Sequence, residues 1–570
     1  MSWRPDMPEE PEDRVKRQLA EAVLFEGLAE AAPREARLHW RLGGRHFRAL
    51  GTFGPFGRPR LAGPVEMAEA DGGWRPAPLA ALVDALPAIP ENCERLDREL
   101  RQTVALCRWN TENLPARERH TLPFAALDGA MSEGHPYHPC FKARTGFSLD
   151  DHAAYGPEAA RAFRLDWLAL PRATVAAALP CSEETFWRGL LGAEWDRLVH
   201  RLTEAGHSPA SHAVLPVHPW QMRRLAGEEP LRTHLTEGRA VALGPAGPRY
   251  RASQSLRTLH DADDPRAPSV KLAMSVVSTS SLRILDPHFV LTAPALSGWL
   301  AEVVAGDPLL DGMAVLREHA AVIADRDGPL AGRLAAIWRE SPVLAPGEAA
   351  VPFNALCAAE PDGRSFVAPW LTRYGLQAWL DRLVEVAVLP VWHLLVAHGV
   401  ALEAHGQNMI LVHRDGWPER VILRDFHESA EYAPDFLRDV PPIPDLGAID
   451  PAHAGPPDDR FHAMRSPATL AELVTDSLFV FNLSEITHGL ARRHWLDEAG
   501  FWESLGRRLR RHAAEHGLTN RLAQLAVEAP RLRVEALLAR KLGLAEARCS
   551  RLVPNALFPS LLPSLLRTAS

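Results

Sequence analysis

The residues best suited to chemistry lie in two polar segments at the ends of neighbouring apolar runs. One segment contributes Glu403, His405 and Asn408, and the other contributes Asp425. The turn-rich stretch 414–419 separates the two runs, so a β-hairpin would bring both segments to the same end. Magnesium prefers a few oxygen ligands, and kinase-like sites hold magnesium-ATP with one Asn and one Asp. The spacing therefore predicts a nucleotide site in which Glu403, Asn408 and Asp425 bind Mg²⁺.

The loop between His405 and Asn408 contains no carboxylate that could accept the proton of an attacking hydroxyl group. Phosphoryl transfer to an alcohol would therefore lack its base. A carboxylate nucleophile is already ionised near neutral pH, so attack on the α-phosphate to give an acyl adenylate fits these residues better. His405 would then be a cation or hydrogen-bond donor toward phosphate. The alternative is a structural hairpin with a polar turn.

A second group of residues has the composition of a clamp for phosphate and carboxylate groups. Phosphates need hydroxyl donors and fixed cations, and Lys or Arg in an apolar strand is costly without an anionic partner. The chain offers both kinds of side chain in Ser255, Arg257, Thr258, Lys271 and Arg283. The hydroxyl run 278–281 adds donors, of which Thr279 is the favoured substrate contact. Each residue alone is more often a surface cation or a turn cap, so the prediction rests on their occurrence together with the hairpin.

A third segment is cationic and stiffened by proline. Two His-Pro pairs begin at His135 and His138, and Lys142 and Arg144 follow. Such a loop suits a small polycarboxylate. A zinc site is the first alternative, although no Cys or third His lies at a useful spacing, and a purely structural loop is the second. His218, in another His-Pro pair, either lines the same cavity or belongs to a strand and turn with Trp220 in the core.

The composition is that of an ordinary globular protein, with 570 residues, 46% hydrophobic and 24% charged. A net charge of -8 argues against a general nucleic-acid or anionic-membrane surface. The six cysteines show no paired spacing, which predicts neither a zinc site nor a disulfide framework and favours a reduced cytoplasm. No long apolar run and no apolar leader are present in the sequence, so we expect neither membrane spanning nor secretion.

The periodicity predicts three units that must position these residues: 1–134, 135–345 and 346–570. The proline-rich stretch 340–352 marks the last boundary. The expected helices are 13–30, 79–109, 376–398, 470–491, 501–516 and 533–547, and the expected strands are 213–217, 239–243, 269–277 and 282–285. A hairpin is expected over 37–50, turning at Gly43 and Gly44. The fold class predicted from these elements is a mixed α/β protein of several domains with a C-terminal helical bundle.

Read in order, these motifs resemble those of the NRPS-independent siderophore synthetases, the aerobactin synthetase family. The matching motifs are His135-Pro-x-His-Pro-x-x-Lys142, His218-Pro-Trp-Gln221, Ser255-x-Arg-Thr258, Lys271 with Arg283, Glu403-Ala-His-x-Gln-Asn408 and Arg424-Asp425. The resemblance covers about half the chain and is specific as a set. It implies a cupped-hand architecture with thumb-like (1–134), fingers-like (135–345) and palm-like (346–570) domains, a distantly kinase-like palm, and a homodimer.

The resemblance also implies the activity and the roles of the residues. The enzyme would be an ATP-dependent ligase that adenylates a carboxylate, with citrate as the first expectation, and condenses it with an amine or hydroxyl, releasing AMP and pyrophosphate. ATP would contact Ser255, Arg257, Thr258, Lys271, His405 and Asp425, and Mg²⁺ would bind Glu403, Asn408 and Asp425. The carboxylate would contact His138, Thr279 and Arg283, and we add Lys142 and Arg144 to this substrate set. Lys271, Arg283 and His405 are the expected catalytic residues.

Two other functions stay open at this point. A small-molecule kinase would use the same Asn408 and Asp425 but release ADP. A non-catalytic carboxylate or siderophore-binding protein would use the cationic loop without ATP. The family also has a further palm arginine facing ATP, for which Arg364 and Arg373 are both candidates here. The sequence does not define the carboxylate, the nucleophile or the number of condensations.

Overall fold

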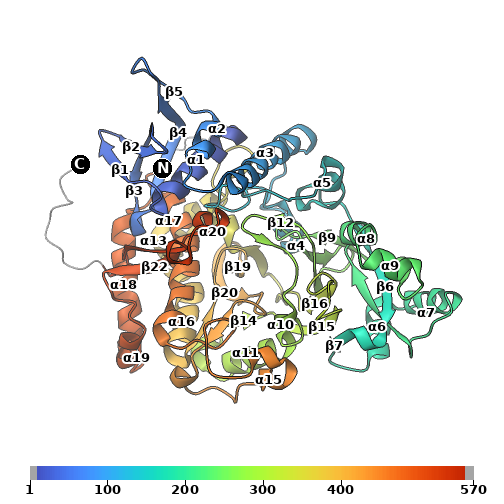
Figure 1. Ribbon diagram of the computed structural model, residues 1–570. Coiled ribbons are helices and arrows are strands. Elements are labelled where there is room, and N and C mark those ends of the chain that lie inside the picture. The colour runs from blue at the N-terminus through green and yellow to red at the C-terminus, as the bar shows by residue number, and fades with distance from the viewer. Residues whose placement is uncertain (1–8, 559–570) are drawn as a thin grey trace.

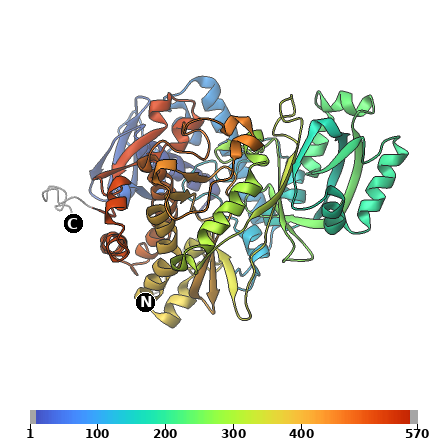
Figure 2. The same cartoon turned by 90° about the horizontal axis from the view of Figure 1, so that it is seen from below.

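The protein folds into a mixed α/β structure, which the computed structural model describes for residues 9–558. A five-stranded sheet and a group of helices lie at one end, and an eight-stranded sheet lies at the other (Figures 1 and 2). The hairpin β19–β20 lies between them. One buried core runs through the N- and C-terminal parts of the chain and includes Phe25, Trp392 and Leu478. A separate core, with Trp167 and Trp338, packs on the eight-stranded sheet.

The N-terminal unit is an antiparallel meander covered by helices. Its strands are β1 (Ala31–Arg34), β2 (Arg37–Leu42), β3 (Arg45–Phe53), β4 (Pro59–Ala68) and β5 (Trp74–Pro76), and its helices are α1 (Pro11–Phe25), α2 (Leu79–Asp84), α3 (Pro90–Asn113) and α4 (Phe124–Ala130). The hairpin predicted at Gly43 and Gly44 is confirmed, because both glycines have positive φ angles between β2 and β3. The helix predicted over 79–109 is divided into two, with Pro90 in the first turn of the second helix.

The middle unit carries the expected sheet, with strand order β7-β15-β16-β11-β10-β9-β6-β8 and antiparallel neighbours throughout. Its strands are β6 (Phe163–Pro171), β7 (Val175–Ala178), β8 (His212–Val217), β9 (Val241–Ala252), β10 (Thr258–Asp261), β11 (Ser269–Leu272), β15 (Glu318–Ala324) and β16 (Ala335–Arg339). Its helices are α5 (Leu149–Tyr155), α6 (Glu183–Leu191), α7 (Glu194–Glu204), α8 (Pro219–Ala226), α9 (Leu231–Thr236) and α10 (Pro287–Val290). The strand predicted over 269–277 ends early, and a small hairpin, β12 (Val277–Ser278) and β13 (Ser281–Leu282), follows it.

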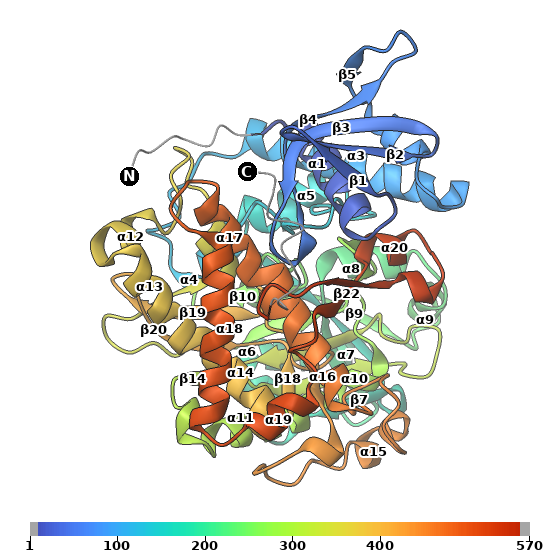
Figure 3. The ribbon, with the colours of Figure 1, turned by 90° about the vertical axis from the view of Figure 1, so that its left-hand side faces the viewer.

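The C-terminal unit is built around a four-stranded sheet of order β14-β20-β19-β17. Its strands are β14 (Met313–Val315), β17 (Ala349–Pro352), β19 (Met409–Arg414) and β20 (Trp417–Leu423), and a separate pair is formed by β18 (Val400–Leu402) and β21 (Ala430–Tyr432). Helices α11 (Ala293–Ala305), α12 (Ala368–Tyr374), α13 (Leu376–Leu383), α14 (Leu389–His393), α15 (Leu446–Ile449), α16 (Pro467–Val474), α17 (Ser484–Ala491), α18 (Glu498–Glu515) and α19 (Thr519–Gln524) surround these strands. Helices α17 and α18 lie beneath the N-terminal sheet (Figure 3).

Two sequence predictions for this unit need correction. The helices expected over 376–398 and 470–491 are present, but π-helical turns interrupt them at Val384–Val388, Leu394–His398 and Thr475–Leu483. The single helix expected over 533–547 is wrong at its start, because β22 (Arg531–Glu535) pairs with β23 (Ser550–Pro554) and only α20 (Leu537–Lys541) is helical. Among the described residues, no helix combines the length and apolarity required to cross a bilayer.

Candidate functional site

The loop that follows β18 and the hairpin β19–β20 bring the first predicted segments together. The two strands pair from Met409 with Leu423 to Arg414 with Trp417, so the connection is a tight two-residue turn and not the longer loop expected. Asp415 and Gly416 both have positive φ angles there, as a turn of this type requires. The backbone N–H of Arg424 donates to the carbonyl of Asn408 at 3.0 Å. This bond holds the two polar segments side by side.

Asp425 follows β20, at the point where the four-stranded sheet meets the eight-stranded sheet. Its Oδ1 is 3.0 Å from Nζ of Lys271 on β11 and 2.8 Å from Nη1 of Arg339 on β16. Burial would raise the pKa of Asp425, but Lys271 and then Arg339 hold it well below its usual value. The carboxylate is therefore charged. Its backbone φ of 69° is left-handed, a conformation that costs a non-glycine residue about 1 to 2 kcal/mol.

His405 and Asn408 are oriented by their own loop. Nδ1 of His405 accepts hydrogen bonds from the N–H groups of Gln407 and Asn408, both at 3.2 Å, so a neutral ring carries its proton on Nε2. That nitrogen lies 3.8 Å from a carboxylate oxygen of Glu403. The amide nitrogen of Asn408 donates to the carbonyl of Glu403 at 3.1 Å. Since the amide nitrogen is used in this way, the oxygen of Asn408 is the atom left for a cation, which fits a magnesium ligand.

The predicted phosphate clamp is assembled on adjacent strands. Thr258 on β10 pairs directly with Lys271 on β11. The Oγ1 of Thr258 is buried and has no hydrogen-bond partner among the described residues. Ser255 precedes the strand, and its Oγ accepts from the N–H of Thr258 at 3.3 Å. A buried hydroxyl without a partner beside a buried ammonium group suits an oxygen-rich anion.

Arg257 and Arg283 complete the clamp. Arg257 donates to the carbonyl of Ile284, and its guanidinium lies 3.8 Å from Glu428. Arg283 donates to the carbonyl of Ser278 at 2.9 Å, and no carboxylate pairs with it among the described residues. Burial and then the charge of Arg257 lower the pKa of Arg283 to about 10. Among the described residues, Arg257 has a carboxylate within 4 Å and Arg283 has none, which leaves the guanidinium group of Arg283 able to pair with an anionic ligand.

The His-Pro loop faces the same region. Nδ1 of His138 accepts from the N–H of Cys140 at 3.1 Å, and burial holds the pKa of His138 well below its usual value. The neutral ring thus carries a proton on Nε2, and this buried atom has no partner among the described residues. Burial, followed by the charge of His405, lowers the pKa of His135 to about 3. The two histidines of the loop therefore present neutral donors, and Lys142 and Arg144 supply its positive charge.

Lys142 and Arg144, by contrast, already have a carboxylate partner. Both bind Glu158, at 2.5 Å from Nζ of Lys142 and 2.8 Å from Nη2 of Arg144. All these side chains are at most 6% exposed. Glu158 offsets one of these two positive charges, and the pairing fixes the His-Pro loop to the segment after α5. In this structure the two cations that were predicted to contact the substrate thus share one buried carboxylate.

Thr279 lies in the β12–β13 turn with a φ of 58°. Its carbonyl accepts a hydrogen bond at 2.8 Å from Lys541 of α20, which also pairs with buried Glu99 of α3. No sequence pattern marks Lys541, because it lies in a segment without a recognisable motif. Helix α20 therefore holds the turn that carries the predicted substrate hydroxyl, and α3 holds the lysine that makes this contact.

One arginine beside Asp425, Arg339, is absent from the predicted site residues. Arg339 contacts Asp425 directly, and Arg424 forms two hydrogen bonds with Asp128 of α4, at 2.9 and 3.0 Å. The two palm arginines considered from the sequence lie elsewhere. Arg364 pairs with Asp362, and Arg373 lies 3.7 Å from Asp415 with a side chain that is 59% exposed. The one indirect sign of Arg339 is its partner: Asp425 was predicted as a ligand, and a buried carboxylate needs a cation nearby.

His218 has a structural role. It caps α8 by accepting from the N–H of Trp220 at 3.1 Å, and its ring packs against Tyr155 and Phe163 with centroids 5.1 and 5.0 Å apart. The interpretation as a strand and fixed turn is therefore the better of the two.

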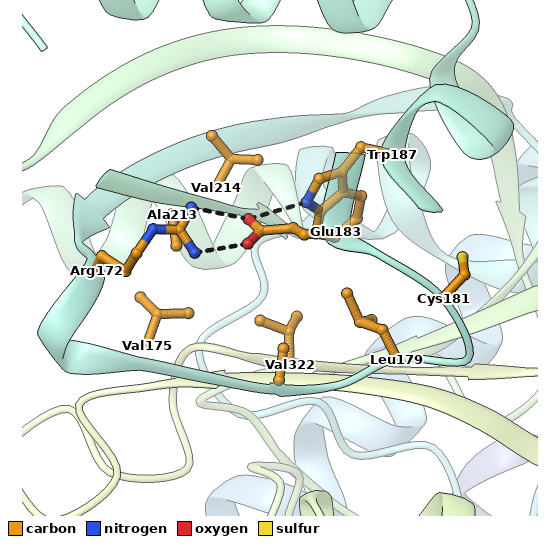
Figure 4. Close-up of a pocket in the computed structure, with 10 residues that line it drawn as sticks. Arg172, Val175, Leu179, Cys181, Glu183, Trp187, Ala213, Val214 and Val322 are labelled. Atoms are coloured by element: carbon orange, nitrogen blue, oxygen red, sulfur yellow. Dashed lines mark hydrogen bonds and ion pairs between the residues drawn. The ribbon is translucent and has the colours of Figure 1, made fainter. Parts of the chain in front are cut away.

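A cavity of about 350 Å³ opens between β7 and β8, away from the predicted site residues (Figure 4). It contains none of the predicted residues, and Arg172 and Glu183 in its wall neutralise one another.

Comparison with known proteins gives consistent matches along the chain. The IucA / IucC family profile matches residues 123–358, and the ferric iron reductase FhuF-like transporter profile matches residues 377–551. The citryl-spermidine/3,4-dihydroxybenzoyl-citryl-spermidine:spermidine ligase of Bacillus anthracis is 35% identical over 444 residues, which is 76% of this chain and 72% of that protein.

Solved structures agree with this match. Petrobactin biosynthesis protein AsbB from Bacillus anthracis has a TM-score of 0.88 and 30% identity, covering 96% of this chain and 95% of that chain. Aerobactin synthetase IucC from Klebsiella pneumoniae has a TM-score of 0.80 and 25% identity, covering 96% of this chain and 98% of that chain.

Proposed function

Because the chain belongs to the IucA/IucC family of NRPS-independent siderophore synthetases, we propose that it uses magnesium-ATP to adenylate a carboxylate and then joins that carboxylate to an amine, releasing AMP and pyrophosphate. Citrate is the proposed carboxylate. The cupped-hand arrangement of thumb, fingers and palm, the kinase-like palm and a homodimer belong to the same proposal.

The observation that carries the proposal is the position of Asp425. Asp425 pairs with the buried cations of the eight-stranded sheet, Lys271 and Arg339. The backbone bond from Arg424 to Asn408 places it beside the loop that follows β18. Glu403, Asn408 and Asp425 would hold magnesium, since together they offer two carboxylates and one amide oxygen. The ion would supply positive charge that offsets the negative charge of the phosphates. Thr258 has a buried hydroxyl free to receive a phosphate oxygen.

The mechanism follows from the charge of these groups. Two polyanions must approach each other, and the fixed cations offset their repulsion. Lys271 and Arg257 would hold phosphate oxygens, and Arg283 would lie between the α-phosphate and the carboxylate. Nε2–H of His405 would donate to phosphate, and Nε2–H of His138 would donate to the carboxylate. A carboxylate oxygen then forms a bond to the α-phosphorus as pyrophosphate leaves, and the nucleophile next displaces AMP from the acyl carbon.

An amine is favoured over a hydroxyl as the nucleophile. Glu431 on β21 lies near Glu403, and burial followed by the charge of Glu403 raises the pKa of Glu431 to about 8. The pKa is raised because burial and neighbouring carboxylates disfavour the charged form of Glu431. A cationic amine bound beside these carboxyl groups would stabilise that charged form. The name of the Bacillus anthracis relative specifies spermidine, a polyamine. We therefore extend the proposal to a polyamine or diamine substrate.

The experiment that tests the proposal measures the nucleotide product with magnesium-ATP, hydroxylamine as a surrogate nucleophile, and citrate, 2-oxoglutarate or succinate in turn. Carboxylate-dependent AMP, pyrophosphate and hydroxamate are expected, with citrate the best acid. ADP would instead identify a kinase. Citrate binding without any dependence on magnesium-ATP would identify a binding protein.

The matched variants are Arg283→Met and Arg373→Met. Both remove a guanidinium group, but Arg283 lies buried in the clamp, whereas Arg373 is largely exposed, lies 3.7 Å from Asp415 and packs over the ring of Tyr374. AMP formation should be lost in the first variant and kept in the second. If Arg283→Met forms AMP as fast as an active Arg373→Met protein does, Arg283 does not belong to the site.

A further inference from the structure

A compact group of one carboxylate and two imidazole rings lies outside the nucleotide site. It consists of Asp307, His393 and His398, hereafter the Asp307 cluster. Their ligand atoms all lie within 4.8 Å of one another. Oδ2 of Asp307 is 2.9 Å from Nε2 of His393 and 2.8 Å from Nε2 of His398. The three atoms therefore converge on one point from two separate parts of the chain.

Local structure explains why the two histidines face the same way. On an α-helix, residues five apart point about 140° away from each other. Here His393 ends α14, and the segment from Leu394 to His398 is a π-helical turn. Its i to i+5 hydrogen bonding brings the two rings to one side. Such turns occur frequently at functional sites.

The far nitrogen of each ring is already engaged. Nδ1 of His398 lies 3.1 Å from the carbonyl oxygen of Arg438, and Nδ1 of His393 lies 2.9 Å from Nε2 of His512. Histidines that bind metals almost always use their second nitrogen in this way, because the outer hydrogen bond orients the ring. In His398, both nitrogens face oxygen acceptors, yet a neutral ring has only one proton to donate. A cation between Nε2 and the carboxylate satisfies both contacts.

The dimensions also fit. Ligand atoms around a tetrahedral zinc ion, at about 2.0 to 2.1 Å from the metal, are about 3.3 Å apart. The two contacts of Asp307, now 2.9 and 2.8 Å, would therefore widen by about 0.4 to 0.5 Å, and the three ligand atoms already lie within 4.8 Å of one another. Both imidazole rings are buried, with side chains 4% and 6% exposed, while the carboxylate is 16% exposed. This leaves room for a water molecule as a further ligand.

From this geometry we propose that the Asp307 cluster binds one divalent transition-metal ion, with His393 and His398 coordinating through Nε2 and Asp307 through Oδ2. Two imidazoles and one carboxylate suit zinc, cobalt, nickel or ferrous iron better than magnesium. The ion would tie three segments together: the turn after α11, the helix that leads through β18 to Glu403, and, through His512, helix α18. The ion would thus anchor the helix that leads to the loop of Glu403, His405 and Asn408, without contacting the nucleotide.

The test is zinc binding to the full-length, chelator-treated protein in excess magnesium, measured as bound zinc per chain after desalting and by calorimetric titration. The wild type should bind one more zinc ion per chain than His398→Gln. His512→Gln should keep the stoichiometry but bind about 10- to 100-fold more weakly. The control is His462→Gln, because His462 is also buried and also donates from Nδ1 to a backbone carbonyl, but has no carboxylate partner. It should bind zinc as the wild type does.

Cobalt provides a second readout, because its visible absorption reports imidazole and carboxylate coordination in the wild type and should be absent from His398→Gln. The same zinc content in the wild type and His398→Gln, or no zinc in the wild type, would overturn the proposal. If His398→Gln fails to fold, Asp307→Asn decides the question by the same stoichiometry, since its carboxylate is partly exposed. These measurements do not involve ATP turnover, so their outcome is separate from the proposed adenylation.

Discussion

Replacing Lys271 by Met should separate the contribution of the clamp from that of the fold. The ammonium group is 3.0 Å from Asp425, and its side chain is only 9% exposed. Charges about 4 Å apart interact by about 4 kcal/mol at an effective dielectric constant of about 20. Removing one fixed donor from a developing anion typically costs about 10²- to 10³-fold in kcat. We expect a loss of this size in AMP formation, since a phosphate oxygen would take the place that Asp425 now holds.

The assay is citrate-dependent AMP and hydroxamate formation, compared with the Lys271→Arg variant, which retains a charge. The fold should survive in Lys271→Met, because Asp425 keeps Arg339 and only one charged hydrogen bond is lost, worth about 1.5 to 3 kcal/mol. Circular dichroism and thermal melting check this point. Turnover within threefold of the wild type in a folded Lys271→Met protein would refute the assignment of Lys271 to phosphate.

Three further predictions concern the carboxylates around the site. Asp128→Asn should lower the free energy of unfolding in urea by about 3 to 5 kcal/mol, because buried Arg424 would lose its charged partner; an unchanged midpoint would contradict this. Asp425→Asn should raise the magnesium concentration needed for half-maximal AMP formation by about 10- to 100-fold, which corresponds to one lost charged ligand, and an unchanged magnesium titration would remove Asp425 from the metal site. Burial raises the pKa of Glu26 to about 7, so the folded protein holds a proton that the unfolded chain releases near pH 4 to 5. This contribution to stability is full at low pH and is lost as pH rises to about 7. Between pH 5 and 8, the unfolding free energy of the wild type should therefore fall by about 2 to 3 kcal/mol relative to that of Glu26→Gln. A difference between the two proteins that does not change with pH would exclude a raised pKa for Glu26.

Local patterns in the sequence predicted the hairpin correctly and selected clamp residues that lie on neighbouring segments of the fold, while their role in binding phosphate stays a prediction. The Asp-Gly pair at 415 and 416 accounts for the turn of the hairpin, and apolar runs define its strands. Lys271 was recognised because a cation in an apolar strand requires an anion. The strand β22 was missed, although its alternation of exposed arginines with buried Leu532 and Val534 has the period of a strand. The helix predicted over 533–547 overlaps the end of this strand.

Other features depend on contacts between distant segments, and no local pattern specifies them. Arg339 is the last residue of an apolar strand and gains its role only because the β20 end lies against β16. Lys541 reaches Thr279 from the opposite end of the chain. The π-helical turn before His398 has no composition that distinguishes it from an α-helix. Such residues become visible only when the topology brings the two sheets together.

The meeting of the four-stranded and eight-stranded sheets also links magnesium binding to nucleotide binding in the proposed mechanism. In this structure Asp425 pairs with Lys271 and Arg339, so the cations of one sheet hold the carboxylate that follows a strand of the other. A magnesium-nucleotide complex supplies a cation for Asp425 and an anion for Lys271 at once. Each partner is exchanged and neither charge is left buried alone, which would cost several kcal/mol. Magnesium or nucleotide added singly would meet only half of this exchange, and we therefore expect the two to bind cooperatively.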